Sequence, residues 1–208
     1  MSSAPERQDQ RLAKGRSTRA LLIAAAIDVL REKGFAATTM RAVAEGAGVQ
    51  LSLVHYHFGS KRRLLVAVLE ELTGELLDRQ QTMFSDGRPF AEQWRTACSY
   101  LRDDIGSGYV RILWELWAAG LADDELAQAW RATQRGWRGL IVARIEQWQD
   151  EASVDLPMSA RAMATLVANL FEGAETEMLA GVGEDEAPHL EALEACAALI
   201  ESLEIRRR

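Results

Sequence analysis

The sequence is poor in the residues and runs that mark secreted and membrane-spanning proteins. Its 208 residues include only two cysteines, Cys98 and Cys196, and four prolines. The apolar stretch 20–30 is too short to span a membrane, which takes roughly 18–20 residues, and Asp28 interrupts it. The first residues lack a signal-peptide core. We therefore expect a cytoplasmic protein without a membrane segment. Both cysteines lie in apolar helical patterns, which favours buried free thiols over a disulfide.

Signatures of enzymes and metal sites are also missing. The chain has no phosphate-cradling glycine loop, no Gly-X-Ser-X-Gly and no His-Glu-X-X-His. His55 and His57 could suggest a metal site, but two imidazoles without cysteine or carboxylate partners at a suitable spacing are too few ligands for zinc. We expect no enzymatic activity, no catalytic residue, no metal and no cofactor.

Charge is distributed unevenly along the chain. The net charge is −7, yet residues 1–63 carry 11 basic and five acidic side chains, a net of +6, whereas residues 64–208 carry a net of −13. A basic segment on an acidic body can dock on phosphates while the body faces away. From the charge alone, a solvated basic face is the simpler interpretation.

The apolar residues follow helical periodicity, and strand-like alternation is absent. With 48% hydrophobic residues the chain can bury a substantial core. Spacings of three, four and seven residues are typical of amphipathic helices. The pattern predicts an all-α protein of about nine helices. We expect them near residues 17–33, 39–47, 50–56, 61–83, 90–104, 109–119, 124–149, 159–180 and 188–204.

The stretch from Thr39 to Lys61 organises the rest of the chain. Thr39 is a plausible N-cap, because its hydroxyl can accept a free backbone N–H at the start of a helix. Gly48 can take the left-handed conformation of a sharp turn, a second short helix follows, and Ser60 caps the next one. A short helix, a glycine turn and another short helix are typical of a helix-turn-helix.

Residues 17–65 resemble the DNA-binding domain of TetR-family transcriptional repressors. Four segments in order carry the resemblance: Gly34–Phe35, Thr38–Ala44, Ala47–Val49 and Val54-His-Tyr-His-Phe-Gly-Ser-Lys61. The sequence departs from the family at Ser52, where many members have glycine or proline, and at His55, where many have tyrosine. The preferred bases are therefore not carried over.

The resemblance implies a division of labour along the chain. Residues 17–63 would be the DNA-binding domain, and residues 64–208 an effector-binding and dimerisation domain. Residues 1–16 are polar and lack apolar periodicity, so we expect a disordered basic arm. The arm either lies along DNA or has no specific role. The helix near 61–83 would couple the two domains.

Eight residues are candidates for contacts with double-stranded DNA: Thr39, Arg41, Gln50, Leu51, Ser52, His55, Tyr56 and Lys61. Gln50 can pair bidentately with adenine, and Leu51 can meet a thymine methyl. Tyr56 matches a family position that touches phosphate. Thr39 and Arg41 suit phosphate contacts at a helix start, although Thr39 acting as a cap alone is an alternative.

The remaining positions of this stretch have different expected roles. His55 could donate to guanine or to phosphate, and Lys61 should grip phosphate. Val54 and Phe58 should point inward. His57 is expected to be packed or hydrogen-bonded, with contact to DNA as the alternative.

All six tryptophans lie in the C-terminal region. Helical bundles hold ligands between their helices, so we expect a pocket for an unknown small-molecule effector, with Asn169 or Glu172 as polar anchor. Its predicted residues are Trp94, Trp114, Trp117, Trp137, Met163, Asn169, Phe171 and Glu172. For any single ring, a role in the core alone is the alternative.

The last two helices, 159–180 and 188–204, should form the interface of a homodimer, because their small residues permit close packing. A two-fold dimer predicts a palindromic operator. The resulting hypothesis is a repressor released from its operator by an effector. The alternatives are a corepressor-dependent regulator and a ligand-binding helical scaffold with a vestigial DNA-binding head.

Overall fold

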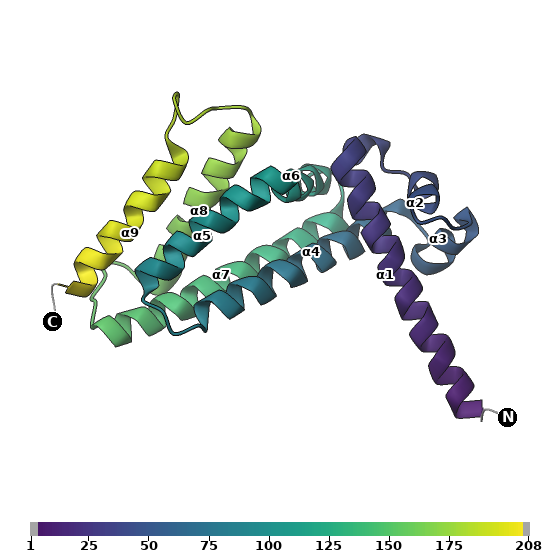
Figure 1. Cartoon of the computed structure of the whole chain (residues 1–208), viewed down its shortest axis with the longest axis horizontal. Coiled ribbons are helices and arrows are strands. Elements are labelled where there is room, and N and C mark those ends of the chain that lie inside the picture. Colours follow the sequence, from purple (N-terminus) through teal and green to yellow (C-terminus); the bar gives the residue numbers. More distant parts are fainter. Residues whose placement is uncertain (1–3, 206–208) are drawn as a thin grey trace. The chain divides into compact units, whose positions relative to one another are not determined.

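The computed structural model describes residues 4–205 and, within them, the side chains of residues 15–204 (Figure 1). This part of the chain forms nine α-helices and no strand, which confirms the all-α prediction. The helices are α1 (Ala4–Ala37), α2 (Met40–Gly46), α3 (Leu51–Phe58), α4 (Lys61–Phe84), α5 (Phe90–Ser107), α6 (Tyr109–Gly120), α7 (Asp124–Ala152), α8 (Ala160–Leu179) and α9 (His189–Ile205). None of these described helices is long and apolar enough to cross a membrane.

The chain folds into two compact units that are not continuous in sequence. The first unit runs to Leu72 and includes Glu115–Trp130, and the second consists of Thr73–Trp114 and the chain from Arg131 onward. The boundary predicted between residues 63 and 64 does not coincide with this division. The predicted division left the Glu115–Trp130 segment out of the first unit. Two carboxylates of this segment contact residues of that unit that lie far away in the sequence.

Helix α1 begins earlier than the sequence predicted. It starts at Ala4, so the prediction of a disordered arm over residues 1–16 is wrong for residues 4–16; residues 1–3 lie outside the described part. Pro5 is tolerated in a first helical turn, and the residues that follow are mostly strong helix formers. The predicted end of this helix is confirmed as a break at Gly34, where φ is 76°.

The first unit is built on the apolar face of α1. Leu22, Ala26 and Leu30, each four residues after the last, are fully buried, as the helical periodicity predicts. The other three helices of its N-terminal part contribute further buried residues. These are Val43 and Ala44 on α2, Val54 and Phe58 on α3, and Leu64 and Val68 on α4. Helix α2 is thereby held beside α1 on one side and beside α3 on the other (Figure 1).

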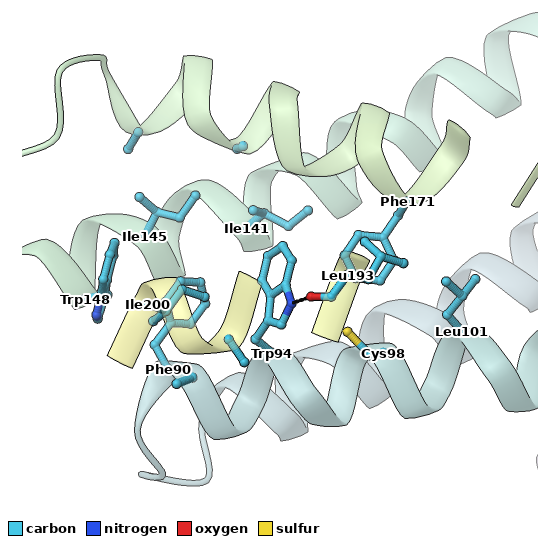
Figure 2. Close-up of a cluster of buried hydrophobic side chains, with 14 of the residues drawn as sticks. Phe90, Trp94, Cys98, Leu101, Ile141, Ile145, Trp148, Phe171, Leu193 and Ile200 are labelled. Carbon is cyan, nitrogen blue, oxygen red and sulfur yellow. Dashed lines mark hydrogen bonds between the residues drawn. The ribbon is translucent and has the colours of Figure 1, made fainter. Parts of the chain in front are cut away.

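The second unit has an aromatic core formed by α5, α7, α8 and α9 (Figure 2). Trp94 lies at its centre, and its ring meets that of Phe171 with centroids 5.5 Å apart. The indole N–H donates to the carbonyl of Leu193 at 2.6 Å. Burying an aromatic side chain of this size stabilises the fold by roughly 4–6 kcal/mol before entropy is counted. This core ties α5 and α8 to α9.

The two cysteines are free thiols, as predicted. Cys98 is fully buried in the aromatic core, whereas Cys196 is only half-buried. Burial raises the pKa of the Cys98 thiol to about 11, with the nearby charge of Glu194 acting in the same direction. Cys98 therefore stays protonated at neutral pH and behaves as a small apolar side chain.

Candidate nucleic-acid interface and effector region

Helices α2 and α3 form the predicted helix-turn-helix. The hydroxyl of Thr39 accepts a hydrogen bond from the backbone N–H of Ala42 at 3.0 Å, which confirms the N-cap. Gly48 has a φ of 65°, which confirms the left-handed turn that a side chain would strain. The hydroxyl of Ser60 accepts from the N–H of Arg63 at 3.3 Å, so the cap of α4 is confirmed too. Local polar groups thus cap the starts of α2 and α4, and the Gly48 turn separates α2 from α3.

Helix α3 has one face in the core and one face in solvent. Val54 and Phe58 are buried, as predicted. Ser52, His55 and Tyr56 are exposed, and Tyr56 exposes 82% of its surface. A short helix anchored on one side, with polar and aromatic side chains on the other, has the form of a recognition element.

Three more predicted DNA contacts lie at the helix starts. Gln50 is exposed at the N-cap of α3 and makes no capping hydrogen bond with its side chain, and Leu51 beside it is half-buried. Arg41 is exposed in the first turn of α2 and forms no ion pair among the described residues. These positions are compatible with contacts to bases and phosphate, and the contacts themselves stay predictions.

His57 is half-buried, and its ring meets that of Tyr56 edge-on, with centroids 5.2 Å apart. A second ring, that of Phe58, lies 6.4 Å away. The surroundings favour the packed interpretation over contact with DNA. Within the described residues, no group of three or more His, Cys, Asp or Glu is placed to hold a metal ion.

Lys61 has a structural role that the sequence did not indicate. Its ammonium donates to the carbonyl of Phe35 at 3.1 Å and lies 4.5 Å from the centre of the Phe35 ring. Burial lowers the pKa of Lys61. A phosphate contact by Lys61 stays a prediction, and it would compete with these internal contacts.

The break in α1 is held by a residue far along the sequence. The backbone N–H of Phe35 donates to the Glu115 carboxylate at 2.8 Å, and the hydroxyl of Thr38 donates to the Gly34 carbonyl at 2.8 Å. Arg62, at the start of α4, pairs with Asp123. Sequence reasoning missed Glu115 and Asp123, because nothing local links them to residues about 60 to 80 positions earlier.

The eight predicted effector residues do not form one group. Trp117 belongs to the first unit, and the other seven belong to the second. Trp94 and Phe171 are buried core residues in ring contact. Trp137 and Met163 are half-buried against the same core. Asn169 is exposed on α8, so the structure gives it no place as a buried polar anchor.

Glu172 and Trp114 belong instead to a polar cluster inside the second unit. Glu172 accepts from the side-chain amide of Gln134 at 2.6 Å and lies 3.6 Å from the Arg138 guanidinium. Trp114 donates its indole N–H to Glu175 at 3.1 Å. Two buried atoms of the cluster, Gln134 Oε1 and Arg138 Nε, have no hydrogen-bond partner among the described residues. Buried polar atoms are normally satisfied, so this cluster can accept further polar groups.

Glu175 is the functional candidate that sequence reasoning missed. Burial raises the pKa of its carboxyl to about 7, and the charges of Glu172 and Asp104 act in the same direction, against the hydrogen bond from Trp114. The sequence did contain one indication of Glu175: it follows Glu172 by three residues, so the two side chains lie on one face of α8. A carboxyl that titrates near neutral pH inside a bundle is a candidate for ligand binding.

The outer faces of the last two helices are apolar. Leu166 and Leu170 on α8, and Leu199 and Leu203 on α9, are exposed large apolar residues. Each pair is spaced by four residues, so its members lie on one side of their helix. Exposed apolar faces of this kind are typical of interaction sites. They lie on the two helices for which the sequence predicts a dimer interface.

The comparisons with known proteins agree with this geometry. Residues 22–68 match the family described as bacterial regulatory proteins, tetR family. The HTH-type transcriptional regulator BetI of Rhizobium meliloti (strain 1021) is 43% identical over 60 residues, which are 29% of this chain and 30% of that protein. The regulator CymR of Pseudomonas putida is 35% identical over 86 residues, 41% of this chain and 42% of that protein. The chain thus spans less than half the length of either relative.

The likeness to solved structures extends further along the chain. A TetR-family transcriptional regulator from Pectobacterium atrosepticum has 27% sequence identity and a TM-score of 0.71, with 94% of this chain and 98% of that chain covered. A TetR transcription regulator from Haloarcula marismortui has the same fold, at a TM-score of 0.73 and 19% identity over 90% of this chain and 97% of that chain. The helix-turn-helix region, residues 22–68, thus matches the tetR family of bacterial regulatory proteins, and the likeness to TetR-family regulators of known structure runs through nearly the whole fold.

Proposed function

We propose that this chain is a sequence-specific DNA-binding transcriptional regulator, and that it acts as a repressor released from its operator by a small-molecule effector. The observation that carries the proposal is the solvent face of α3. Ser52, His55 and Tyr56 are held outward there by the buried Val54 and Phe58. The relatives reported above carry the names of transcriptional regulators, which supports the same conclusion.

The chemistry of this face suits the major groove and its phosphates. Tyr56 can donate its phenol O–H to a phosphate oxygen, and Arg41 can add a charge that is not neutralised by a carboxylate. Ser52 and Gln50 carry donors and acceptors for base edges. Phosphate contacts set position and base contacts set sequence preference, so both kinds are needed for a specific operator.

For the effector, we propose that the polar cluster of Trp114, Glu172 and Glu175 lies at its binding site. The unpartnered atoms of Gln134 and Arg138 support this proposal, because a ligand would satisfy them. Helix α4 contributes residues to both units and is a continuous route for coupling. By linkage, DNA must weaken effector binding by the factor by which the effector weakens DNA binding.

We further propose a homodimer through the apolar faces of α8 and α9, which would present two copies of α3 to a palindromic operator. Leu199 supports the proposal, since 66% of its surface would otherwise face water. Burying these leucines against a second copy would contribute roughly 1.5–3 kcal/mol for each side chain that becomes fully covered.

The test begins with selection of bound genomic fragments by the purified chain, followed by affinity measurements on the recovered operator. We expect Tyr56→Ala to weaken operator binding by about tenfold or more, and Arg41→Ala to reduce the slope of the salt dependence by about one. Arg31→Ala is the matched control, because Arg31 is an exposed cation that pairs with Asp28 on α1.

The proposal is contradicted if no genomic fragment is enriched although circular dichroism shows a folded chain. That result would favour the alternative of a ligand-binding helical scaffold with a vestigial DNA-binding head. Equal losses in Tyr56→Ala and Arg31→Ala would also contradict the assigned face. An effector that strengthens rather than weakens operator binding would replace the repressor-release mechanism by the corepressor mechanism.

A further inference from the structure

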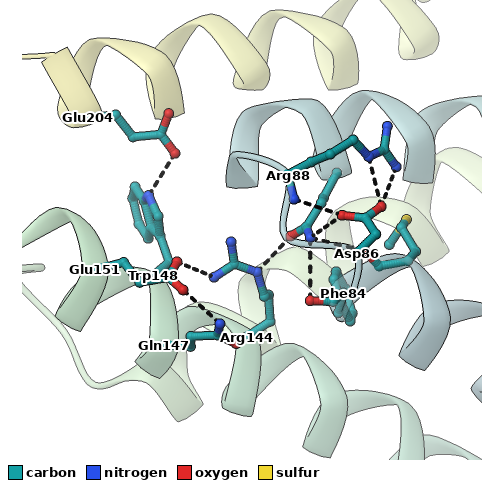
Figure 3. Close-up of polar contacts among 10 residues, drawn as sticks. Phe84, Asp86, Arg88, Arg144, Gln147, Trp148, Glu151 and Glu204 are labelled. Atoms are coloured by element: carbon teal, nitrogen blue, oxygen red, sulfur yellow. Dashed lines mark hydrogen bonds and ion pairs between the residues drawn. The ribbon is translucent and has the colours of Figure 1, made fainter.

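The second unit contains a cavity of about 410 Å³ that none of the predicted effector residues lines. It lies between the α4–α5 loop, the C-terminal part of α7 and the end of α9 (Figure 3). Its size falls within the range of small-molecule sites. Its wall includes apolar groups from Phe84, Pro89, Phe90, Trp148 and Ala152.

Arg144 is the buried charge in this wall. Only 4% of its side chain is exposed, and its guanidinium lies 5.0 Å from the centre of the Phe90 ring. A buried guanidinium requires acceptors for its five N–H groups. Its Nε donates to Gln93 Oε1 at 2.6 Å, and its Nη1 lies 3.3 Å from Glu151 Oε2.

The second amino nitrogen of Arg144, Nη2, has no acceptor among the described residues. In Figure 3 this nitrogen points into the space between Glu204 and Arg88. The one carboxylate that Arg144 contacts, Glu151, is half-exposed and makes a single long contact. Arg–carboxylate pairs gain most from two parallel hydrogen bonds, and Arg144 has the free donors for such a pair.

The surroundings hold Arg144 in this position. Gln93 is buried, and its amide donates to the carbonyl of Met83 at 3.0 Å and to Asp86 at 3.0 Å. This leaves Gln93 Oε1 to accept from Arg144. Asp86 also binds Arg88, so the charge of Arg88 is already balanced. The guanidinium of Arg144 is therefore fixed before any ligand arrives.

Two features disfavour a cationic ligand. The face of Phe90, which could attract a cation, is already occupied by Arg144. Glu204, a carboxylate in the wall, is engaged by the indole N–H of Trp148 at 3.0 Å. Of the groups in the cavity wall, the free donors of Arg144 lie beside aromatic carbon, which is complementary to an acceptor attached to an apolar body, although Glu204 keeps one carboxylate oxygen, Oε2, outside its bond to Trp148.

We propose that this cavity binds a small organic carboxylate. The ligand's carboxylate would accept hydrogen bonds from Arg144 in competition with Glu151, and its apolar body would lie against Phe90, Trp148 and Ala152. The site differs in its residues from the effector cluster around Glu175, and it does not depend on the DNA-binding proposal.

The test is calorimetric titration of the full-length chain with benzoate, alongside benzamide, benzylamine and inorganic phosphate. We expect saturable binding of benzoate only. Arg144→Gln should weaken that binding by about tenfold or more, because the ion pair is lost. Glu151→Gln should tighten it several-fold, since it removes the competing carboxylate. Glu146→Gln, an exposed glutamate on the same helix outside the cavity wall, should leave it unchanged.

Glu151→Gln keeps the test decisive even where Arg144→Gln impairs folding, because Glu151 is half-exposed. The proposal is overturned if benzoate does not bind, if benzamide, benzylamine or phosphate binds as well as benzoate, or if Glu151→Gln binds no more tightly than Glu146→Gln. Arg138→Gln separates the two sites: a loss of benzoate binding there, with Arg144→Gln unaffected, would assign the ligand to the Glu175 cluster and contradict the cavity.

Discussion

The two units use aromatic side chains in opposite ways. In the first unit, Tyr56 stands 82% exposed on α3, among polar neighbours on a segment with net positive charge. In the second, Trp94 is 7% exposed, and its only polar atom is committed to the Leu193 carbonyl. An exposed ring adds little to folding and is available to a partner, whereas a buried ring stabilises the fold and is unavailable to one.

The same contrast holds for charge. Arg41 of α2 and the solvent face of α3 lie in water, where charged and polar groups cost little and Arg41 can attract phosphate. Glu175 and Arg144 lie inside the second unit, where each needs a partner. A charged group that lies inside a bundle and lacks some of its partners is therefore a stronger indication of a ligand site than a charged group in water. The difference separates the surface that we propose binds DNA from the interior sites that we propose bind small molecules.

The largest effect is expected when one aromatic ring is removed from each unit. Trp94→Ala should lower the free energy of unfolding by about 3–5 kcal/mol, because it leaves a cavity and removes the indole hydrogen bond to the Leu193 carbonyl. Tyr56→Ala should change it by no more than about 0.5 kcal/mol. Urea unfolding followed by circular dichroism measures both. Similar losses in the two variants would mean that Tyr56 contributes to the core and is not a free contact residue.

A second test compares exposed leucines in the two units. Leu199→Arg should raise the dissociation constant of a dimer by about 30-fold, or ~2 kcal/mol, by placing a charge in an apolar interface. Leu121→Arg is the control, since Leu121 of the first unit is more exposed still at 73%. Sedimentation velocity over a concentration series measures the equilibrium. A wild-type chain that stays monomeric at micromolar concentration would remove the basis for the interface.

The smallest effect concerns the pH dependence of stability. Because the pKa of Glu175 is raised from its ordinary 4.5 to about 7, the folded chain binds this proton more tightly than the unfolded chain. Its contribution to stability therefore falls as pH rises between these two values. Glu175→Gln should be more stable than the wild type above pH 7, by about 1–2 kcal/mol after allowance for partial exposure.

Below pH 4.5 this difference should vanish, because the carboxyl is then protonated in both states. Thermal unfolding across pH 4–8 measures the effect, with Glu146→Gln as the exposed control. If the two variants follow the same pH profile, Glu175 is not the titrating group.

The predictions that held depend on neighbours in the sequence. The apolar face of α1, the Thr39 cap and the Gly48 turn involve contacts within a few residues, so spacing and residue type suffice to locate them. The predicted disordered arm was wrong because missing amphipathicity does not prevent a helix of strong helix formers. Helix existence was therefore easier to predict than the first residue of α1.

The sequence by itself determined the all-α class, the helix-turn-helix and the asymmetry of charge, since each is encoded in local order. Only the tertiary structure decided that Glu115 holds the break before α2 and that Lys61 turns to Phe35. It also decided that the side chain beside Trp114 is the Glu175 carboxyl and not the Asn169 amide. It also revealed the Arg144 cavity. These contacts join residues tens of positions apart, and their partners are selected by packing and by the need to satisfy buried polar groups, which spacing along one helix does not specify.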